Sequence, residues 1–296
     1  MGETRRSTAM IKLIHPQEQP SMMPAPPAVL VFAATDPSGG AGLQADLLTL
    51  SSMGCHPLSV VTGITVQDTT GVEDILAMDA EWVVDQARCI LEDVPVAVFK
   101  LGVLGSVEII AAIAEIVADY PEVPLVLDPV LTSGRGDELA NEEMLEALRD
   151  LILPQTSLVT PNVMELMRLA YDEAPEEERP DYARAAMEVL ESGCEFVLVT
   201  GTHAPGVQVV NTLYGREGII RSDRWERLPG SYHGSGCTLS SAIAASLAQG
   251  LPIPEAVAEA QDYTWQTLKE GYRLGMGQII PDRLFWAREE PRNDVH

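Results

Sequence analysis

Short apolar segments alternate along this chain with segments of helical composition, and this alternation restricts the possible folds more than any other feature. The first segment, Ala28–Ala34 (AVLVFAA), contains no polar residue, as expected for a strand buried on both faces. Similar strands are predicted at residues 58–65, 96–102, 125–130, 157–160 and 196–200. Helices are predicted at residues 43–53, 80–92, 107–120, 142–151, 164–171, 183–191, 237–249 and 253–272. This order predicts a mainly parallel sheet covered by helices on both faces.

The pattern changes in residues 207–228, where β-rich segments are separated by Gly215 and Gly218. We interpret these segments as a small antiparallel addition at one edge of the sheet. No internal repeat and no clear linker divides the chain, so residues 28–296 are predicted to form a single α/β domain. The preceding residues 1–27 become polar and proline-rich and are expected to form a disordered tail.

The balance of charge limits the classes of partner. Acidic residues outnumber basic ones by 44 to 19, which gives a formal net charge of −25. Such a surface repels nucleic-acid backbones and anionic membranes, and no apolar run reaches the roughly 18 residues of a membrane helix. The four cysteines are widely spaced and form no CxxC pair. This spacing favours a reduced, cytoplasmic protein over a disulfide framework or a zinc site.

Binding residues are expected where the parallel strands end, because ligands of such sheets bind at that edge. After the first strand, residues 35–42 (TDPSGGAG) contain three glycines that let a ligand approach the backbone, and the following helix favours an anion or polar group at its start. Asp46 lies in the first turns of that helix, where a solvated surface acid is also favourable. Gln67 follows the second strand and either binds the edge of a heterocycle or belongs to an ordinary polar loop.

Three charged residues lie near the ends of later strands. Lys100 stands at the end of an apolar strand, where a cation needs a partner, and it either neutralises phosphate charge or forms an ion pair with a buried acid. Asp128 ends another strand and Glu165 follows the next one. Two carboxylates near a nucleotide suit Mg²⁺. Glu165 is alternatively a capping acid in the first turn of a helix that begins after Asn162.

The most specific segment is residues 233–240 (HGSGCTLS), in which glycines lead into a helix of small residues. Small side chains let the helix pack closely, so that its first N–H groups point at one spot and form an anion hole for a phosphoryl group in transfer. Cys237 is expected in the first turn, where the helix dipole lowers the pKa of a thiol. The alternative is a buried, inert cysteine, but the neighbouring glycines favour a functional one.

Seven segments, in this order along the chain, closely resemble the hydroxymethylpyrimidine/phosphomethylpyrimidine kinases, the thiamin-pathway family of the ribokinase-like superfamily. They read ATDPSGGAGLQAD, TVQDTTGV, FKLGVLG, VLDPV, TPNVMEL, VLVTGTH and HGSGCTLSSAIAA. The resemblance extends from Val29 toward the C-terminus. It implies a ribokinase-like three-layer α/β/α sandwich. It also implies ATP-dependent phosphorylation of 4-amino-5-hydroxymethyl-2-methylpyrimidine and of its monophosphate in thiamin biosynthesis, with ATP and Mg²⁺ as cofactors.

Position by position, the resemblance implies four groups of site residues. The aminopyrimidine is expected to contact Ala41, Asp46 and Gln67, with Val103 and Val130 lining its pocket. Mg²⁺ is expected at Asp128 and Glu165. The anion hole and catalytic centre are expected at Gly234, Ser235, Gly236 and Cys237, where most superfamily relatives have an aspartate in place of the cysteine. ATP is expected along Lys100, Asn162, Gly201, Thr202 and His203.

Three places depart from the family pattern. Ala34 replaces a glycine that is frequent in the family, and Thr200 stands in place of a lysine. The loop that contains Gly134 and Arg135 usually carries Lys-Ser or Thr-Ser, and Arg135 is a candidate for replacing the missing cation. These changes affect nucleotide affinity and the preference between the two phosphorylation steps, and leave the kinase class intact.

Two other functions compete with this interpretation. Pyridoxal kinase belongs to the same superfamily and acts on a similar ring-bearing alcohol, but the pair Asp46 and Gln67 favours the aminopyrimidine. A non-catalytic pyrimidine-binding sensor belongs to a different class, and it would be expected to lose Cys237, Glu165 or the glycines, all of which are present. A homodimer is expected, with residues 207–228 as the candidate contact.

Overall fold

The computed structural model describes residues 24–132, 136, 139–171, 181–201 and 206–288. These residues form a sheet with the strand order β3-β2-β1-β4-β5-β6-β7-β8-β9. The strands from β2 to β7 in that order run parallel, whereas β3 at one edge and β8 and β9 at the other run antiparallel to their neighbours. The strands are β1 (Ala28–Ala34), β2 (His56–Gln67), β3 (Val72–Ala77), β4 (Val96–Leu101), β5 (Leu125–Leu127), β6 (Leu158–Val159), β7 (Phe196–Val199), β8 (Gln208–Gly215) and β9 (Gly218–Glu226).

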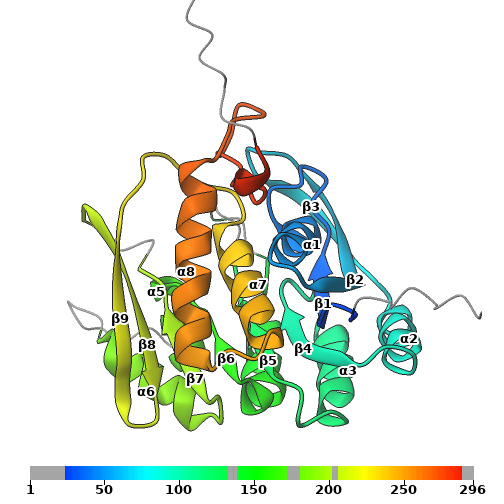
Figure 1. Ribbon diagram of the computed structural model, residues 1–296. Coiled ribbons are helices and arrows are strands. Elements are labelled where there is room, and N and C mark those ends of the chain that lie inside the picture. Colours follow the sequence, from blue (N-terminus) through cyan, green and yellow to red (C-terminus); the bar gives the residue numbers. More distant parts are fainter. Residues whose placement is uncertain (1–23, 133–135, 137–138, 172–180, 202–205, 289–296) are drawn as a thin grey trace, which may run out of the picture.

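Helices cover both faces of the sheet (Figure 1). The helices on one face, in front in this view, are α1 (Gly42–Ser52), α7 (Ser235–Ala248) and α8 (Ile253–Lys269). Those on the other face are α2 (Ala80–Leu91), α3 (Val107–Ala118), α4 (Glu142–Ala147), α5 (Val163–Ala170) and α6 (Tyr182–Glu191). The predicted three-layer α/β/α sandwich with a mainly parallel sheet is therefore confirmed.

Strand β1 shows how the sheet separates two hydrophobic cores. All of its residues are buried, with Leu30 and Phe32 in one core and Val29 and Val31 in the other. Side chains alternate between the two faces of a strand, so a strand covered on both faces must be apolar throughout. The prediction of this strand from its uninterrupted apolar run is confirmed at both ends.

The two edges of the sheet differ in how well the sequence predicts them. The antiparallel addition expected at one edge is confirmed, because β8 and β9 form a hairpin there. Strand β3 at the opposite edge was not predicted. Its sequence, VEDILA, exposes Glu73, Asp74 and Leu76, so it lacks both the continuous apolar run and the regular alternation that mark a strand.

Parts of the sequence predictions fall outside this description. The predicted tail lies largely in residues 1–23, which are outside the described residues, as is Arg135. The single domain predicted for residues 28–296 stays a prediction. Within the described ranges, no helix combines the length and the apolar character needed to cross a membrane.

Candidate active site

A cavity of about 520 Å³ opens at the edge of the sheet where the parallel strands end. Most of the site residues predicted from the sequence line it: Ala41, Gln67, Lys100, Val103, Asp128, Val130, Asn162, Glu165, Gly234, Ser235, Gly236 and Cys237. Segments far apart in the sequence thus meet at one place, as expected for an α/β sheet. Asp46 and Gly201 are not among the lining residues, and Thr202 and His203 lie outside the described residues.

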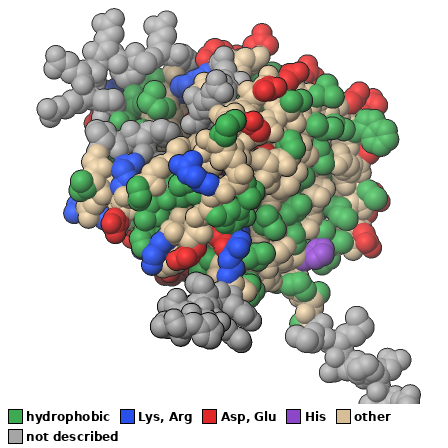
Figure 2. All heavy atoms as spheres, turned by 90° about the horizontal axis from the view of Figure 1, so that it is seen from above, with side chains coloured by type: hydrophobic (Ala, Val, Ile, Leu, Met, Phe, Trp, Pro, Cys, Tyr) green, Lys and Arg blue, Asp and Glu red, His purple; other side chains and the backbone are tan. Residues whose placement is uncertain are grey.

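The face above this edge is less acidic than the composition suggests. Seen from above, it carries mainly hydrophobic and uncharged side chains, with Lys and Arg side chains on one side and much of the acidic surface along the opposite margin (Figure 2). The formal net charge of −25 therefore does not dominate this face. An anionic ligand can approach it with less repulsion than the net charge alone implies.

One end of the cavity is largely apolar. Val103, which follows β4, and Val130, which follows β5, line it together with Ala34 at the end of β1. The carbonyl group of Val103 accepts hydrogen bonds from the amide of Ala34 at 3.1 Å and from the hydroxyl of Thr62 at 2.6 Å, so the ends of β1 and β4 are held to β2. Gln67 adds an amide to this wall. Apolar walls with one amide suit a heterocyclic ring.

The start of α7 supplies a group of free backbone donors. The helix begins at Ser235, and Gly234 before it has a φ of 75°, in the left-handed region that favours glycine. The first helical hydrogen bond runs from the amide of Thr238 to the carbonyl of Gly234 at 2.9 Å. The amides of Ser235, Gly236 and Cys237 precede it and have no partner within the helix. This is the geometry of an anion hole.

The position of Cys237 is as predicted, but its acidity is not. The residue lies in the first turn of α7 and lines the cavity. Burial and the nearby carboxylate of Asp128 raise the pKa of the thiol, and Lys100 opposes them only in part. The prediction of a lowered pKa is therefore wrong, because it considered only the helix dipole. The thiol is neutral in this environment, and its hydrogen bond reaches Asp128.

Lys100, in the cavity wall, forms a buried ion pair with Asp46. Both side chains are fully buried, and the Lys100 Nζ lies 2.9 Å from each carboxylate oxygen of Asp46. Ser241 of α7 donates to the same carboxylate at 2.7 Å. Burial alone would lower the pKa of Lys100, but the negative groups around it, Asp46 first, outweigh burial and raise it. Lys100 therefore stays charged.

This ion pair bears on two expectations. Asp46 was expected to contact the pyrimidine, but its carboxylate oxygens are occupied by Lys100 and Ser241 and its side chain is not exposed to the cavity. For Lys100 the sequence allowed either a phosphate contact or an ion pair with a buried acid, and the structure shows the ion pair. Its charge lies beneath Cys237 and Asp128, since it acts electrostatically on both.

Asp128 and Glu165 both line the cavity and are both buried, with exposed fractions of 4% and 8%. Glu165 belongs to a capping box, in which the Asn162 side chain accepts from the amide of Glu165 at 3.0 Å and Glu165 accepts from the amide of Asn162 at 2.9 Å. Burial and the neighbouring Asp128 raise the pKa of Glu165 to about 8. The capping alternative is thus realised, and a second carboxylate lies close enough to repel this one.

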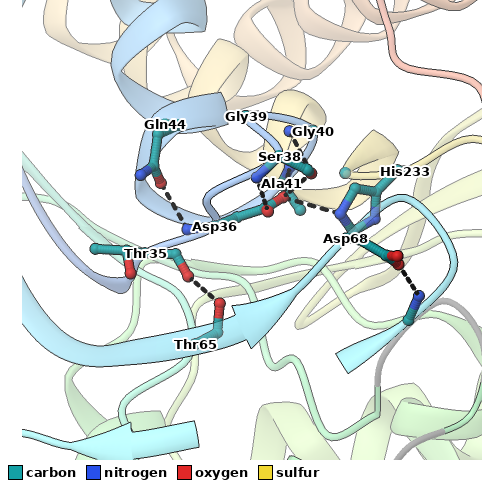
Figure 3. Close-up of polar contacts among 12 residues, drawn as sticks. Thr35, Asp36, Ser38, Gly39, Gly40, Ala41, Gln44, Thr65, Asp68 and His233 are labelled. Atoms are coloured by element: carbon teal, nitrogen blue, oxygen red, sulfur yellow. Dashed lines mark hydrogen bonds and ion pairs between the residues drawn. The ribbon is translucent and has the colours of Figure 1, made fainter. Parts of the chain in front are cut away.

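The loop between β1 and α1 is organised around Asp36 (Figure 3). Its carboxylate accepts hydrogen bonds from the amide of Ser38 at 2.8 Å and from the amide of Ala41 at 2.7 Å. His233, in the loop before α7, places its Nε2 2.8 Å from the same carboxylate. Gln44 accepts from the amide of Asp36 at 2.7 Å. The two glycine-containing loops are therefore joined by one buried carboxylate, a role that no sequence pattern indicated.

Asp36→Asn is expected to destabilise the protein in a pH-dependent way. Burial by itself raises the pKa of Asp36, but hydrogen bonds from His233, Ser38 and Ala41 outweigh it and lower the pKa below its ordinary value. A carboxylate with a lowered pKa stabilises the fold above its unfolded pKa of about 3.9, and this contribution is lost as the pH falls through the folded value. We expect the variant to lose about 1–3 kcal/mol at pH 7.

Urea unfolding at a series of pH values checks this. The difference in the free energy of unfolding between wild type and Asp36→Asn should be constant near neutral pH and should shrink once the pH falls below about 4. Asp119→Asn, at an exposed carboxylate paired with Arg88, is the control and should show little gap at any pH. A gap for Asp36→Asn that does not change with pH would contradict the role of its charge.

The other end of the cavity is formed by residues that the sequence did not single out. They are Asn211 and Trp225 of the β8–β9 hairpin and Gln261, Thr264 and Trp265 of α8. Gln261 accepts from the Asn211 amide at 2.9 Å and from the Trp225 indole at 3.2 Å, and Asn211 accepts from the amide of Gly201 at 3.0 Å. Gly201 therefore supports this end from behind. The only sequence signal for this end of the cavity was the presence of polar residues, such as Asn211 and Gln261, within β-rich or helical segments.

Comparison with known proteins finds relatives of this chain in a family model, in curated proteins and in solved structures. The family model described as phosphomethylpyrimidine kinase matches residues 36–282. A hydroxymethylpyrimidine/phosphomethylpyrimidine kinase of Streptomyces coelicolor is 38% identical over 269 residues, which cover 90% of this chain and 97% of the relative. The chain is thus similar to this enzyme over nearly the full length of both.

Two solved structures show the same fold. A pyridoxal kinase from Staphylococcus aureus in complex with ADP has a TM-score of 0.81 at 27% identity, covering 90% of this chain and 97% of that one. A phosphomethylpyrimidine kinase from Clostridium difficile has a TM-score of 0.70 at 34% identity, covering 82% and 99%. These similarities confirm the ribokinase-like fold expected from the sequence.

Proposed function

The chain belongs to the phosphomethylpyrimidine kinase family, and from this premise we propose that it phosphorylates 4-amino-5-hydroxymethyl-2-methylpyrimidine and then the resulting monophosphate. The γ-phosphoryl group of ATP is transferred in both steps, within thiamin biosynthesis. One observation carries the proposal: a single cavity joins an apolar, amide-bearing end to the free amides that begin α7. The acceptor ring and the transferring phosphoryl group thus have adjoining places.

The aminopyrimidine occupies the apolar end in this proposal. Val103 and Val130 pack against the ring, Gln67 hydrogen-bonds to its edge, and Ala41 borders the hydroxymethyl group. The donor and acceptor of one carboxamide match the amino group and ring nitrogen of an aminopyrimidine. Asp46 is not part of this set, because it holds Lys100.

ATP lies toward the other end, with its γ-phosphate at the amides of Ser235, Gly236 and Cys237. The Staphylococcus aureus pyridoxal kinase binds ADP, which supports a nucleotide donor for this fold. Asn162 borders this half of the cavity, and Gly201 supports it from behind through its hydrogen bond to Asn211. Thr202 and His203 stay predicted nucleotide contacts.

Asp128 and Glu165 fit a Mg²⁺ ion. Both line the cavity, and the proximity of Asp128 is one cause of the raised pKa of Glu165, a repulsion that a divalent cation would relieve. Mg²⁺ usually takes one or two protein carboxylates and completes its shell with water and phosphate oxygens. When bound, the ion would neutralise charge on the phosphates. Within the described residues no cluster of three or more histidine, cysteine or acidic side chains offers an all-protein metal site.

The two steps make different demands on Cys237. In the first step, a bond forms from the hydroxymethyl oxygen to the γ-phosphorus, the bond from that phosphorus to ADP breaks, and the alcohol releases a proton. In the second step, the attacking phosphate oxygen is already anionic and releases none. Phosphoryl transfer passes through a loose transition state, so positioning and charge matter more than a strong base. We assign the proton of the first step to a relay: as the Cys237 sulfur takes the alcohol proton, the thiol passes its own proton to the carboxylate of Asp128, to which it is hydrogen-bonded.

Cys237→Ala is expected to slow the alcohol step far more than the monophosphate step. Loss of the relay that takes up the proton reduces kcat with the alcohol by about 10²–10⁴-fold, whereas kcat with the monophosphate should fall less than about tenfold, because its anionic oxygen has no proton to transfer. Separate steady-state assays with each pyrimidine measure the two values. Cys89→Ala, at an exposed cysteine of α2, is the control. Equal losses in both steps would contradict the assignment.

The substrate is tested by ADP release from the purified protein with Mg-ATP and one acceptor at a time. The alcohol, its monophosphate and pyridoxal are compared by kcat/KM, with pyridoxal included because of the similarity to the Staphylococcus aureus enzyme. Turnover of both pyrimidines supports the proposal. Turnover of pyridoxal alone would keep the mechanism and replace the substrate. No turnover with any of the three would favour a sensor.

Two further expectations remain proposals of their own. We propose a homodimer that pairs through residues 207–228, and a cytoplasmic location in keeping with four unpaired cysteines. Sedimentation at several concentrations tests the first. Substitution of Ile219, an exposed apolar residue of β9, by Glu should then shift the protein toward the monomer.

A further inference from the structure

Arg283 lies after α8, far in sequence from every motif of the site, and is almost completely buried, with 3% of its surface exposed. Its guanidinium group donates to the Thr238 hydroxyl at 3.0 Å from Nε, to the Gly40 carbonyl at 2.5 Å from Nη2 and to the Gly39 carbonyl at 3.4 Å from Nη1. Nη2 also approaches the Gly234 carbonyl at 3.5 Å. One side chain therefore contacts both glycine-containing loops and the first turn of α7.

The two loops touch each other where Arg283 joins them. A Cβ atom placed on Gly234 would lie 2.0 Å from the Gly40 carbonyl oxygen, and one placed on Gly40 would lie 2.2 Å from the His233 ring. On the other side of this contact, Asp36 bridges the loops through His233. The loops are thus held at two points, by Asp36 and by Arg283.

The hydrogen bonds of Arg283 also orient the anion hole. A trans peptide unit is planar, with its C=O and N–H groups pointing in opposite directions. The carbonyl of Gly234 faces Arg283 and the Thr238 hydroxyl, which donates to it at 2.8 Å. The amide of Ser235, on the same peptide unit, is therefore turned away from Arg283, toward the cavity that Ser235 lines.

The positive charge of Arg283 is buried close to the anion hole at the start of α7. Among the described ion pairs none involves Arg283, and its hydrogen-bond acceptors are three carbonyl groups and one hydroxyl. A buried positive charge normally requires a nearby anion. Arg283 interacts electrostatically with Cys237 and Asp46, and it stands behind the end of α7 whose dipole is positive.

We propose that Arg283 is a positioning residue for phosphoryl transfer: it locks the loop before α1 to the loop before α7, aims the Ser235 amide into the cavity, and adds positive charge behind the anion hole. It does not line the cavity and so acts through the loops rather than on the substrate. The part that concerns catalysis rests on the proposed function. The part that concerns anion binding does not, because it needs only an anion at the start of α7.

Kinetics of Arg283→Met and Arg283→Lys test the catalytic part. Arg283→Met should lower kcat on the alcohol and on the monophosphate by similar factors, up to about 100-fold, because a displaced anion hole serves both steps. The KM of the alcohol should change less than about threefold, since the apolar end of the cavity is untouched. Arg283→Lys, which keeps the charge, should recover part of the loss. Arg88→Met, which removes an exposed arginine on α2, is the control.

Protection of Cys237 tests the anion-binding part without any turnover. Alkylation of Cys237 by iodoacetamide is followed by mass spectrometry with and without inorganic phosphate, at about pH 9 and over long reaction times because only the thiolate form reacts. The exposed Cys89 of the same molecule is the internal reference. Phosphate should slow alkylation of Cys237 in the wild type. The factor by which phosphate slows it should be at least several-fold smaller in Arg283→Met and intermediate in Arg283→Lys. Cys89 should react equally in all samples.

The outcomes separate the two proposals. If the wild type turns over no pyrimidine but phosphate protection depends on Arg283, the proposed function fails and the anion-binding role stands. Unchanged kcat and unchanged protection in folded Arg283→Met would overturn the inference. The inference would also be overturned if the losses of kcat and of phosphate protection matched the fraction of unfolded protein and Arg283→Lys recovered neither. If Arg283→Met does not fold, Arg283→Lys decides, and wild-type behaviour of that variant would overturn the inference.

Discussion

Gly234→Ala is expected to lower kcat by about 10²–10³-fold on both pyrimidine substrates, the loss typical of removing one oxyanion-hole donor. Gly234 has a φ of 75°, which an alanine adopts only with strain, and the added Cβ would lie 2.0 Å from the Gly40 carbonyl oxygen and 2.8 Å from the Cα of Ala41. Both atoms belong to backbone, so one of the two loops must move. The amide of Ser235 moves with it.

Gly250→Ala is the matched control for this prediction. Gly250 follows the other end of α7 with a φ of 91°, but nothing lies within 4 Å of its added Cβ. It should therefore lose roughly 1 kcal/mol of stability from the left-handed backbone and keep its kcat. Thermal unfolding of both variants measures the cost of the left-handed backbone, and steady-state kinetics shows whether displacement of the loops lowers kcat. A Gly234→Ala enzyme with normal kcat would show that the α7 amides do not stabilise the transferring phosphoryl group.

Lys100→Met is expected to reduce the free energy of unfolding by about 3–5 kcal/mol, because it leaves the carboxylate of Asp46 buried without its cation. Asp46→Asn should be similarly severe, since it leaves a fully buried ammonium group. Urea unfolding at pH 7 measures both. The double variant should lose clearly less than the sum of the single losses, because each single change removes the same interaction.

The surface pair Arg88 and Asp119 provides the control for the buried one. Its side chains are 38% and 57% exposed, and Arg88→Met should therefore lose less than about 1 kcal/mol. Additive losses in Lys100→Met and Asp46→Asn would mean that the two charges do not stabilise each other. Losses as small as that of Arg88→Met would contradict the buried ion pair itself.

The sequence predicted the layout of the site well, because that layout follows from local patterns. Apolar runs such as Ala28–Ala34 give the parallel strands, and parallel strands bring their carboxyl ends to one edge. Gln67 and Asp128 at strand ends and Cys237 at the start of a helix were therefore expected to meet, and they do line one cavity. Nothing beyond the order and type of the elements was needed for this.

The ionic state of the site could not be predicted in the same way. The expected low pKa of Cys237 used only the dipole of its own helix, whereas its actual environment includes desolvation by the surrounding protein and the carboxylate of Asp128, which follows β5. The partner of Lys100 is Asp46, 54 positions away on α1. No periodicity marks a contact between a strand and a helix at that separation, so the sequence left its partner open.

Arg283 and strand β3 were missed for a related reason. Arg283 makes its hydrogen bonds to Gly39 and Gly40, more than 240 positions away, and mainly to backbone carbonyls, which carry no side-chain signature. Strand β3 is an edge strand, paired on one side only, with charged residues facing solvent. Edge strands need no continuous apolar run, and charged residues there prevent pairing with other chains.

The central claim is that one site carries out two successive phosphorylations of an aminopyrimidine. The most direct measurement is a time course by liquid chromatography and mass spectrometry, started with the purified protein, Mg-ATP and 4-amino-5-hydroxymethyl-2-methylpyrimidine alone. We predict that the monophosphate forms first and then declines as the diphosphate rises, with two ADP released for each diphosphate. Absence of any phosphorylated pyrimidine, or a monophosphate that persists while ATP remains, would contradict the claim.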